Sequence, residues 1–377
     1  MSVRALARVN LAAVERNVAR LCAGLGPGTG LCAVTKANGY GHGAVPVARA
    51  ALAGGARLLA VASAAEAAEL RDAAIDAPVL LLGALSDEEL PVALGARAEL
   101  VAWTERFVSE LARRAGGGEG VQPVRVHVKL DTGMGRLGTR VLDEAVRVAE
   151  QVAITPGLEL AGAMTHFASA DEDPEFTAAQ LARFEPFVRA MRERWPAIAA
   201  HAANSAATLR EPASHLDFVR CGIATYGCDP MNQDPAAHGL EPVLELSSYV
   251  AAVKSAAPGE SAGYGRQWVA RAETWIATVP IGYADGIRRA LSNNCEVLIG
   301  GRRYPLVGTV SMDNITVEVG VPDVVACGER VTIIGRDGNE RITAEELAQR
   351  LGTINYEIVC GISGRVPRVY HRDGAPA

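Results

Sequence analysis

The sequence predicts an N-terminal (β/α)8 barrel of the TIM type followed by a mainly β domain. Over roughly the first 235 residues, apolar runs of strand length alternate with alanine-rich stretches of helical length. The apolar runs are continuous and do not alternate with polar residues, which is typical of parallel strands buried on both faces. From about residue 240, runs rich in Val, Ile, Thr and Tyr lie between Gly, Pro and Asn turns, and helical patterns become scarce.

Eight candidate strands can be counted in the first part, the number that closes a TIM barrel. They are Leu31–Asn38, Arg57–Ser63, Pro78–Gly83, Leu100–Trp103, Val124–Asp131, Leu158–Phe167, Ile198–Ser205 and Phe218–Gly227. The helix expected before them, about Leu11–Gly24, lies outside this count. The clearest helices between them are Ala64–Ala74, Glu105–Ala115, Arg140–Val152 and Phe176–Arg194. A doubly wound open sheet is the alternative, and the absence of GxGxxG after the first strand weakens it.

The second domain is expected to contain several short strands and one clear helix. The strands are Ser247–Val253, Thr274–Val279, Glu296–Leu298, Ile315–Val319 and Arg330–Ile334, and the helix is Thr343–Leu351. The segment Asp229–Pro242 holds three prolines and Gly239, so the boundary is expected there. We therefore divide the chain into residues 1–235 and 236–377.

Composition excludes several classes of protein. The 377 residues carry a formal net charge of -6, and no basic stretch indicates binding to nucleic acid. No apolar run reaches the length of a membrane helix, and the first residues lack the apolar core of a signal peptide. The seven cysteines form no CxxC pair, as expected for reduced thiols in a cytoplasmic protein.

Lys36 is the most informative residue of the chain. It follows a short apolar run and precedes the glycine-rich segment Ala37-Asn38-Gly39-Tyr40-Gly41-His42-Gly43. A lysine at the mouth of a strand can join a cofactor aldehyde covalently and can also act as a base. This context predicts a pyridoxal 5'-phosphate enzyme.

Further polar residues fall at the ends of the later strands, where a TIM barrel places its catalytic groups. They are Lys129, Asp131, His166, His201, Asn204, Ser205 and Arg220, with Arg136 in the loop after Asp131. Any one of them could be a solvated loop residue, a core histidine or a helix N-cap, but together they indicate a site. Ser205 and the backbone amides of Gly222 and Ile223 fall after the seventh and eighth strands, where barrels often bind phosphate.

Arg220 is informative about the chemistry. Arginine donates hydrogen bonds and does not give up its proton, so beside a pyridine nitrogen it would leave that nitrogen unprotonated. The cofactor would then be a weak electron sink, which favours an enzyme that moves one proton and nothing else.

The second domain contributes tyrosines in glycine-containing motifs and one further tyrosine outside them. Tyr264 lies in Gly263-Tyr264-Gly265, Tyr283 lies in Gly282-Tyr283-Ala284, and Tyr356 follows Asn355. Met312-Asp313 stands in a further glycine-containing motif that begins at Gly308. Each motif alone could equally be a turn with a packed side chain.

Taken together, these residues resemble the alanine racemase family, and the resemblance runs from Val9-Asn10-Leu11 to Gly361-Ile362-Ser363. The family implies a pyridoxal phosphate-binding barrel, a β domain, and a head-to-tail homodimer with shared active sites. It also implies interconversion of L-alanine and D-alanine by two bases, supplying D-alanine for peptidoglycan.

The resemblance assigns roles to individual positions. Lys36 matches the lysine that links to the cofactor and is the base on the D-alanine side, and Tyr264 matches the base on the L-alanine side, supplied by the partner subunit. The residues matching phosphate ligands are Tyr40, Ser205, Gly222, Ile223 and Tyr356, and Asn204 is expected beside them. Arg220 matches the partner of the pyridine nitrogen, and His166 matches the residue bonded to the catalytic tyrosine.

The remaining assignments concern the substrate. Arg136 matches the residue that binds the substrate carboxylate, and Lys129 matches a lysine that is carbamylated in many members. Tyr283, Met312 and Asp313 are expected near the substrate. Gly39 stands where alanine is frequent in the family, and Thr309 stands where arginine is common.

Three other functions stay open. A racemase of broader or serine-directed range shares these residues, and a decarboxylase shares the barrel and the lysine. Arg220 speaks against the decarboxylase, which is expected to pair the pyridine nitrogen with an acid. A barrel that only holds the cofactor would lack a second domain, so the segment 240–377 argues against it.

Overall fold

The computed structural model describes residues 4–115 and 122–377. Contacts between Cα atoms divide these residues into two compact units. The barrel unit comprises residues 14–39 and 44–225, and the β unit comprises residues 4–13, 40–43 and 226–377. The expected boundary at 235/236 remains a prediction, and the division by contacts instead falls at 225/226 and gives the first strand to the β unit.

The barrel unit contains eight parallel strands, as predicted from the sequence. They are β2 (Gly30–Val34), β3 (Leu58–Val61), β4 (Val79–Leu81), β5 (Leu100–Ala102), β6 (Val124–Lys129), β7 (Leu158–Met164), β8 (Ala199–His201) and β9 (Phe218–Cys221). They pair in the orders β4-β3-β2-β9 and β5-β6-β7-β8. A parallel bridge between Leu80 and Glu99 and a hydrogen bond from Arg220 N to Ala203 O (2.9 Å) join the two sets and close the barrel.

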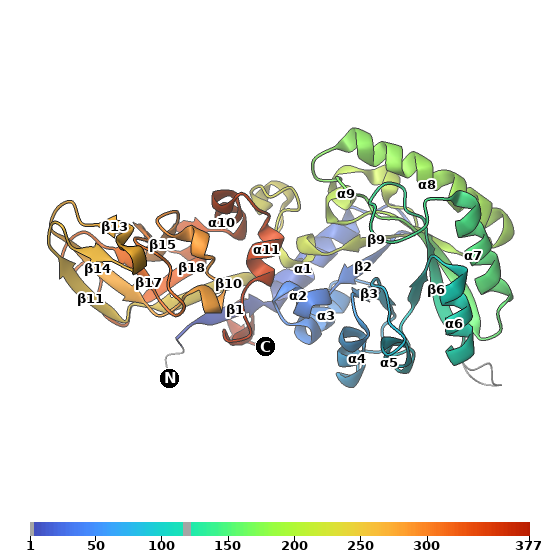
Figure 1. The fold of residues 1–377 in the computed structure, drawn as a ribbon, viewed down its shortest axis with the longest axis horizontal. Coiled ribbons are helices and arrows are strands. Elements are labelled where there is room, and N and C mark those ends of the chain that lie inside the picture. The colour runs from blue at the N-terminus through green and yellow to red at the C-terminus, as the bar shows by residue number, and fades with distance from the viewer. Residues whose placement is uncertain (1–3, 116–121) are drawn as a thin grey trace. The chain divides into compact units, whose positions relative to one another are not determined.

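Helices surround these strands (Figure 1). They are α1 (Leu11–Ala23), α3 (Ala44–Ala53), α4 (Ala64–Asp72), α5 (Glu89–Gly95), α6 (Glu105–Ala115), α7 (Leu142–Ile154), α8 (Pro174–Arg194) and α9 (Ser205–Arg210). The strands supply fully buried residues such as Leu59, Leu80 and Leu100, against which the buried alanines of the helices pack. The sequence did not separate α3 and α5 from their surroundings.

The β unit is built on an eight-stranded sheet in the order β16-β15-β18-β10-β1-β20-β21, with β19 paired to β18. Its strands are β1 (Leu6–Asn10), β10 (Leu244–Tyr249), β15 (Glu296–Ile299), β16 (Arg302–Pro305), β18 (Arg330–Asp337), β19 (Glu340–Ile342), β20 (Arg368–Arg372) and β21 (Ala375–Pro376). A second sheet contains β11 (Ala252–Ala256), β14 (Thr274–Val279) and β17 (Ile315–Glu318), and two short strands pair as β12 (Ser261–Ala262) and β13 (Trp268–Val269). Two helices, α10 (Ala344–Leu351) and α11 (Asn355–Cys360), complete the unit.

One strand expectation was wrong. Ser247–Val253 is not a single strand, because the chain leaves one sheet after Tyr249 and enters the other at Ala252. Between them, Val250 N bonds to Glu329 O and Ala251 N bonds to Thr278 O, so neighbouring amides serve different sheets. Among the described residues, no helix is both long and apolar enough to cross a membrane.

Candidate active site

Lys36 lies two residues beyond the end of β2 and begins a tight left-handed turn, α2 (Lys36–Tyr40). Ala37, Asn38, Gly39 and Tyr40 have φ values of 52°, 53°, 60° and 50°. The left-handed region costs an L-residue about 1–2 kcal/mol, so the three L-residues among these four need support from their surroundings. Strain of this kind gathers at functional sites.

Glu66 provides part of that support. Its Oε1 accepts a hydrogen bond from the amide of Ala37 (2.6 Å), the first left-handed residue. Its Oε2 accepts from the amide of Ala62 (2.7 Å), at the end of β3, and Glu66 also forms the capping box of α4 with Ser63. The same carboxylate therefore fixes a helix start and the turn that carries Lys36.

Arg220, on β9, is the centre of a buried hydrogen-bond cluster in the barrel unit. Nη1 lies 2.6 Å from Nδ1 of His201, and Nη2 lies 3.1 Å from Nδ1 of His166. Nη2 also donates to the carbonyls of Thr165 and Ala202, at 2.8 Å each. Nε has no hydrogen-bond acceptor among residues 4–115 and 122–377, although the residue is only 2% exposed.

The partners of Arg220 are neutral. Burial, together with the positive charge of Arg220, holds the pKa values of His166 and His201 well below the ordinary range. Burial also lowers the pKa of Arg220 itself to about 10. The guanidinium is thus a buried positive charge whose Nε–H is among the donors left for another molecule.

Lys129, at the end of β6, adds a second buried amine. It is 4% exposed, and burial lowers its pKa to about 8, with further lowering by the positive charges of Arg220 and Arg136. Asp131 opposes this effect, but among the described residues Lys129 has no ion pair. The charges of Lys36, Lys129, Arg136 and Arg220 all act on His166, so the structure brings these five predicted residues together.

Asp131 shapes the loop that carries Arg136. Its Oδ1 accepts from the amides of Gly133 (3.1 Å) and Gly135 (3.0 Å), and its Oδ2 accepts from Nε of Arg140 (3.0 Å). These bonds hold the pKa of Asp131 below its usual value against the opposing effect of burial. Arg136 is an exposed residue of this loop, so its guanidinium can meet a ligand.

Ser205 and the start of the segment after β9 are also adjacent. The Ser205 hydroxyl accepts a hydrogen bond from the amide of Gly222 (2.9 Å), and Ile223 begins the short helix η2 (Ile223–Tyr226). Asn204 is the N-cap of α9, and its side chain accepts from Ala207 N (3.0 Å). The hydroxyl and the amides of two helix starts therefore meet in one place.

Two of the expected phosphate ligands belong to the β unit. Tyr40 is buried, and its ring stacks on Tyr226 with centroids 4.9 Å apart. The ring of Tyr356 lies 6.1 Å from that of Tyr40. Tyr40 and Tyr356 therefore lie near each other within the β unit.

The β unit exposes the other predicted residues. Tyr264, Tyr283 and Met312 are 74%, 43% and 52% exposed. Their loops are tied together in pairs: Thr309 Oγ1 donates to Tyr264 O (2.7 Å), and Tyr283 N donates to Ser311 O (2.9 Å). Asp313 accepts from Nη2 of Arg365 (2.7 Å), and a cavity of about 400 Å³ lies beside Tyr264.

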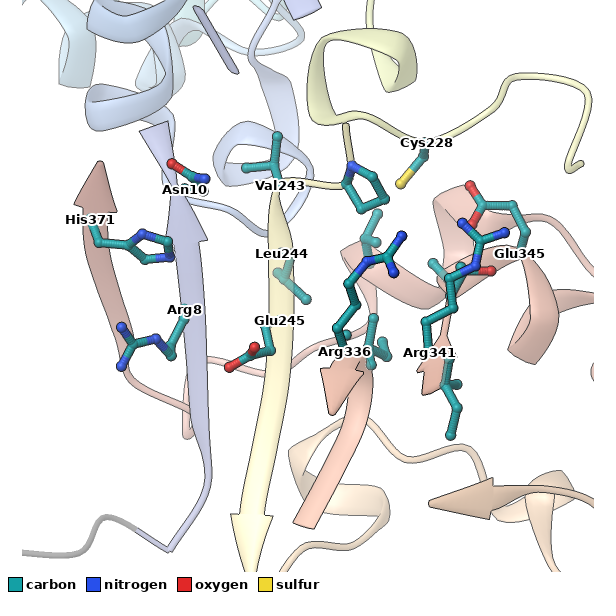
Figure 2. Close-up of a pocket in the computed structure, with 17 residues that line it drawn as sticks. Arg8, Asn10, Cys228, Val243, Leu244, Glu245, Arg336, Arg341, Glu345 and His371 are labelled. Atoms are coloured by element: carbon teal, nitrogen blue, oxygen red, sulfur yellow. The ribbon is translucent and has the colours of Figure 1, made fainter. Parts of the chain in front are cut away.

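Another pocket in the β unit is unrelated to the predicted site. It has a volume of about 230 Å³, and Figure 2 shows Arg8 and Asn10 on one strand and Arg336 and Arg341 across the sheet. None of the residues predicted for the site lines it. Arg341 is paired with Asp234, so the charges around this pocket are partly satisfied within the chain.

Comparison with known proteins shows the family of the chain. Residues 9–230 match the family description "Alanine racemase, N-terminal domain", and residues 243–370 match "Alanine racemase, C-terminal domain". The chain belongs to the alanine racemase family. Relatives cover nearly its full length: the alanine racemase of Geobacillus kaustophilus is 40% identical over 368 residues, which is 97% of this chain and 94% of the relative.

Solved structures of the family have the same fold. The alanine racemase from E. faecalis superposes with a TM-score of 0.92 at 37% identity, covering 98% of this chain and 100% of that one. The alanine racemase from Bacillus anthracis with bound L-Ala-P gives 0.90 at 38% identity, covering 100% and 97%. The architecture predicted from the sequence is therefore that of the family.

The sequence pattern did not indicate the side chains that continue the hydrogen bonds of Arg220 into the barrel. His201 was expected only as a strand-end residue, and His127 and Glu99 were not considered. A signal was present, because His127 and Lys129 are two apart on β6 and so point to the same side of the strand. A histidine within an otherwise apolar buried strand needs a polar partner.

Proposed function

We propose that the protein is a pyridoxal 5'-phosphate-dependent alanine racemase that interconverts L-alanine and D-alanine. Membership of the family supports this function, and the cluster around Arg220 is the observation that carries it. The reaction would take place in the cytoplasm and supply D-alanine for peptidoglycan. The alternative of a decarboxylase is disfavoured, because a buried guanidinium with neutral partners offers no acid to a pyridine nitrogen.

The residues present fit the cofactor. Nε of Arg220 has no hydrogen-bond acceptor among the described residues, which suits the lone pair of an unprotonated pyridine nitrogen. Ser205 accepts from the Gly222 amide and can still donate its own hydroxyl proton, so together with the Ile223 amide it suits a phosphate. Tyr40 and Tyr356 are the further phosphate ligands that the family resemblance implies. Lys36 would hold the aldehyde. When bound, the cofactor supplies electron withdrawal that acidifies the Cα–H bond of the amino acid.

Two bases on opposite faces of the substrate would invert its stereocentre. Lys36 Nζ would accept or return the proton on the D-alanine side, and the Tyr264 hydroxyl would do so on the L-alanine side. A free tyrosine has a pKa of about 10, so its oxygen needs a positive neighbour to act as a base near neutral pH. In the single chain Tyr264 is 74% exposed. A base that takes a proton from carbon needs a site closed to water, so Tyr264 has to be covered during the reaction.

We therefore infer that a second copy of the chain covers Tyr264. The exposed side chains of Tyr264, Tyr283 and Met312 lie on loops that are hydrogen-bonded in pairs, and exposed apolar residues of this kind are typical of protein interfaces. A homodimer in which each chain lends Tyr264 to the active site of the other accounts for this exposure.

The substrate carboxylate would bind Arg136. Arginine pairs with a carboxylate through two parallel hydrogen bonds, which fixes the orientation of the bound amino acid. Lys129 lies close enough to Arg136 for the two charges to interact. The lowered pKa of Lys129 makes its amine nucleophilic enough to take up CO2. A carbamate on Lys129 would supply the negative charge that this cluster of cations lacks.

Polarimetry tests this proposal. The purified protein with added cofactor should remove the optical rotation of L-alanine completely, and it should act on L-serine much more slowly. Equal rates would favour the broader racemase, and no loss of rotation with either amino acid would reject the function. Lys36→Ala should abolish both the activity and the absorbance band of the covalently bound cofactor.

A further inference from the structure

Four side chains form a continuous hydrogen-bonded chain inside the barrel unit. Nη1 of Arg220 lies 2.6 Å from Nδ1 of His201, and Nε2 of His201 lies 3.0 Å from Nδ1 of His127. Nε2 of His127 then lies 2.8 Å from Oε2 of Glu99. Glu99 immediately precedes β5, so the chain runs from Arg220 to the amino-terminal end of a barrel strand.

The direction of every bond in this chain is determined. Arginine only donates, so Nδ1 of His201 must accept, and the proton of His201 must be on Nε2. That proton can only be donated to Nδ1 of His127, so the proton of His127 is on Nε2 and is donated to the Glu99 carboxylate. Both rings are therefore neutral Nε2–H tautomers, and all three bonds point from Arg220 toward Glu99.

The packing around the two rings leaves them little freedom. Phe218 stacks on His201 with ring centroids 4.1 Å apart and meets His127 edge-on at 6.3 Å. Gly162 makes room for His127, because a Cβ there would lie 2.4 Å from Nδ1 of His127. A side chain at this position of β7 would displace the ring and break the chain.

These hydrogen bonds link the buried positive charge of Arg220 to the carboxylate of Glu99. Among the described residues, Arg220 contacts only neutral groups, so its nearest hydrogen-bonded carboxylate is Glu99, two rings away. Burial alone would raise the pKa of Glu99, but the hydrogen bond from His127 and the pairing with Arg125 lower it below its usual value. Arg125 Nε lies 2.8 Å from Glu99 Oε1, and Arg125 also pairs with Glu159.

We propose that Glu99 is a positioning residue that acts on Arg220 through His127 and His201. The carboxylate fixes the tautomer of both rings, and the rings present a lone pair to Nη1, which turns Nε toward the space where a pyridine nitrogen would bind. The catalytic consequence of this inference rests on the proposed function, but the hydrogen bonds from Arg220 to Glu99 do not depend on that function.

Nitrogen NMR of the histidine-labelled holoenzyme tests the chain directly. We expect His127 and His201 to be neutral near pH 7, each with a protonated Nε2 and an unprotonated Nδ1. We also expect two strongly hydrogen-bonded imidazole protons downfield of the amide region. A proton on Nδ1 of His201 would overturn the proposal, whether or not the protein racemizes alanine.

Glu99→Gln tests the positioning role, with Glu159→Gln as its matched control. Both variants replace a carboxylate that pairs with Arg125, but only Glu99 contacts His127. Glu99→Gln should shift the imidazole protons and lower kcat by about tenfold or more, the effect of weakening one hydrogen bond to a charged group. KM for alanine should change less than about twofold, because Glu99 does not act on substrate binding.

The control should leave the NMR spectrum and kcat unchanged. A merely structural role would lower the melting temperature of Glu99→Gln without changing kcat per folded site, and that result would reject the proposal. If Glu99→Gln does not fold, His127→Phe takes its place, since phenylalanine also has a flat ring and can neither accept from His201 nor donate to Glu99. A kcat like that of the wild type in this variant would reject the proposal equally.

Discussion

Nδ1 of His201 lies 2.6 Å from Nη1 of Arg220, and this contact makes a neutral ring the acceptor for a fully buried guanidinium. The second neighbouring ring, His166, accepts from Nη2 in the same way. Arg220 therefore keeps its charge without a direct ion pair among the described residues. A guanidinium can donate to several separate acceptors at once, whereas lysine has a single ammonium group, so lysine cannot replace arginine at such a position.

Arg220→Lys should therefore be strongly destabilising. A lysine cannot reach both histidines and the carbonyls of Thr165 and Ala202, so buried acceptors lose their donors. We expect a loss of about 2–4 kcal/mol in the free energy of unfolding, measured by urea denaturation. Arg192→Lys, in an exposed pair with Asp217, should cost less than about 1 kcal/mol. Equal losses in the two variants would contradict this account.

Glu66→Gln should disturb the turn that carries Lys36. The amide group of glutamine would place a donor against a backbone amide that Glu66 now accepts from, at Ala37 or at Ala62 and Ser63. Without that bond the left-handed residues lose support, so we expect racemization to fall by about tenfold. The matched control is Glu69→Gln, an exposed residue of the same helix, which should keep the wild-type rate. Polarimetry measures both, and similar rates for the two variants would refute the role of Glu66.

The sequence predicts the barrel well, because buried parallel strands are continuous apolar runs, and all eight are found. It overestimates where they end. The first candidate strand was expected to reach Asn38, but β2 stops at Val34, because the residues after Lys36 are left-handed. Only Asn38 and Gly39 hint at this conformation, and Ala37 and Tyr40 give no sign of it.

Non-local pairing accounts for most of what the sequence does not predict. β1 lies between β10 and β20, which are more than 200 residues away along the chain, and no local pattern reveals such partners. The link from Glu99 to Arg220 likewise depends on four strands being in register. Candidate residues at strand ends could be predicted, but the contacts between them could not.

Lys129→Met should change how stability depends on pH. The pKa of Lys129 is lowered to about 8 in the folded chain, below the ordinary lysine value of about 10.4. Below pH 8 the amine is charged in both the folded and the unfolded chain, so the full cost of burying it is present and the variant should be more stable. Between about pH 8 and 10 the folded chain releases the proton first, so the wild type gains stability relative to the variant.

Urea denaturation from pH 7 to 10, in buffer free of CO2, measures this difference. The gap at pH 7 should be on the order of 3 kcal/mol and should shrink steadily as the pH rises. Added bicarbonate should narrow the gap at pH 7 as well, since a carbamate would pair with the surrounding cations. Stability curves that stay parallel across the whole range would show that Lys129 is not a buried charged amine.

Mixing two inactive variants tests whether the active sites are shared between chains. Lys36→Ala lacks one base, and Tyr264→Phe lacks the other while keeping the aromatic ring. Each homodimer should be inactive in racemization. In a mixed dimer with shared sites, the Lys36 of one chain meets the Tyr264 of the other, which restores one complete site and leaves the second without either base.

Random exchange in a two-fold symmetric dimer makes half of the dimers mixed, so activity should return to about a quarter of the wild-type level. If both bases came from the same chain, every site in the mixture would lack one of them, and no activity would return. Polarimetry before and after subunit exchange distinguishes the two arrangements. A mixture of the wild type with Lys36→Ala, carried through the same exchange, shows whether the treatment itself inactivates the protein.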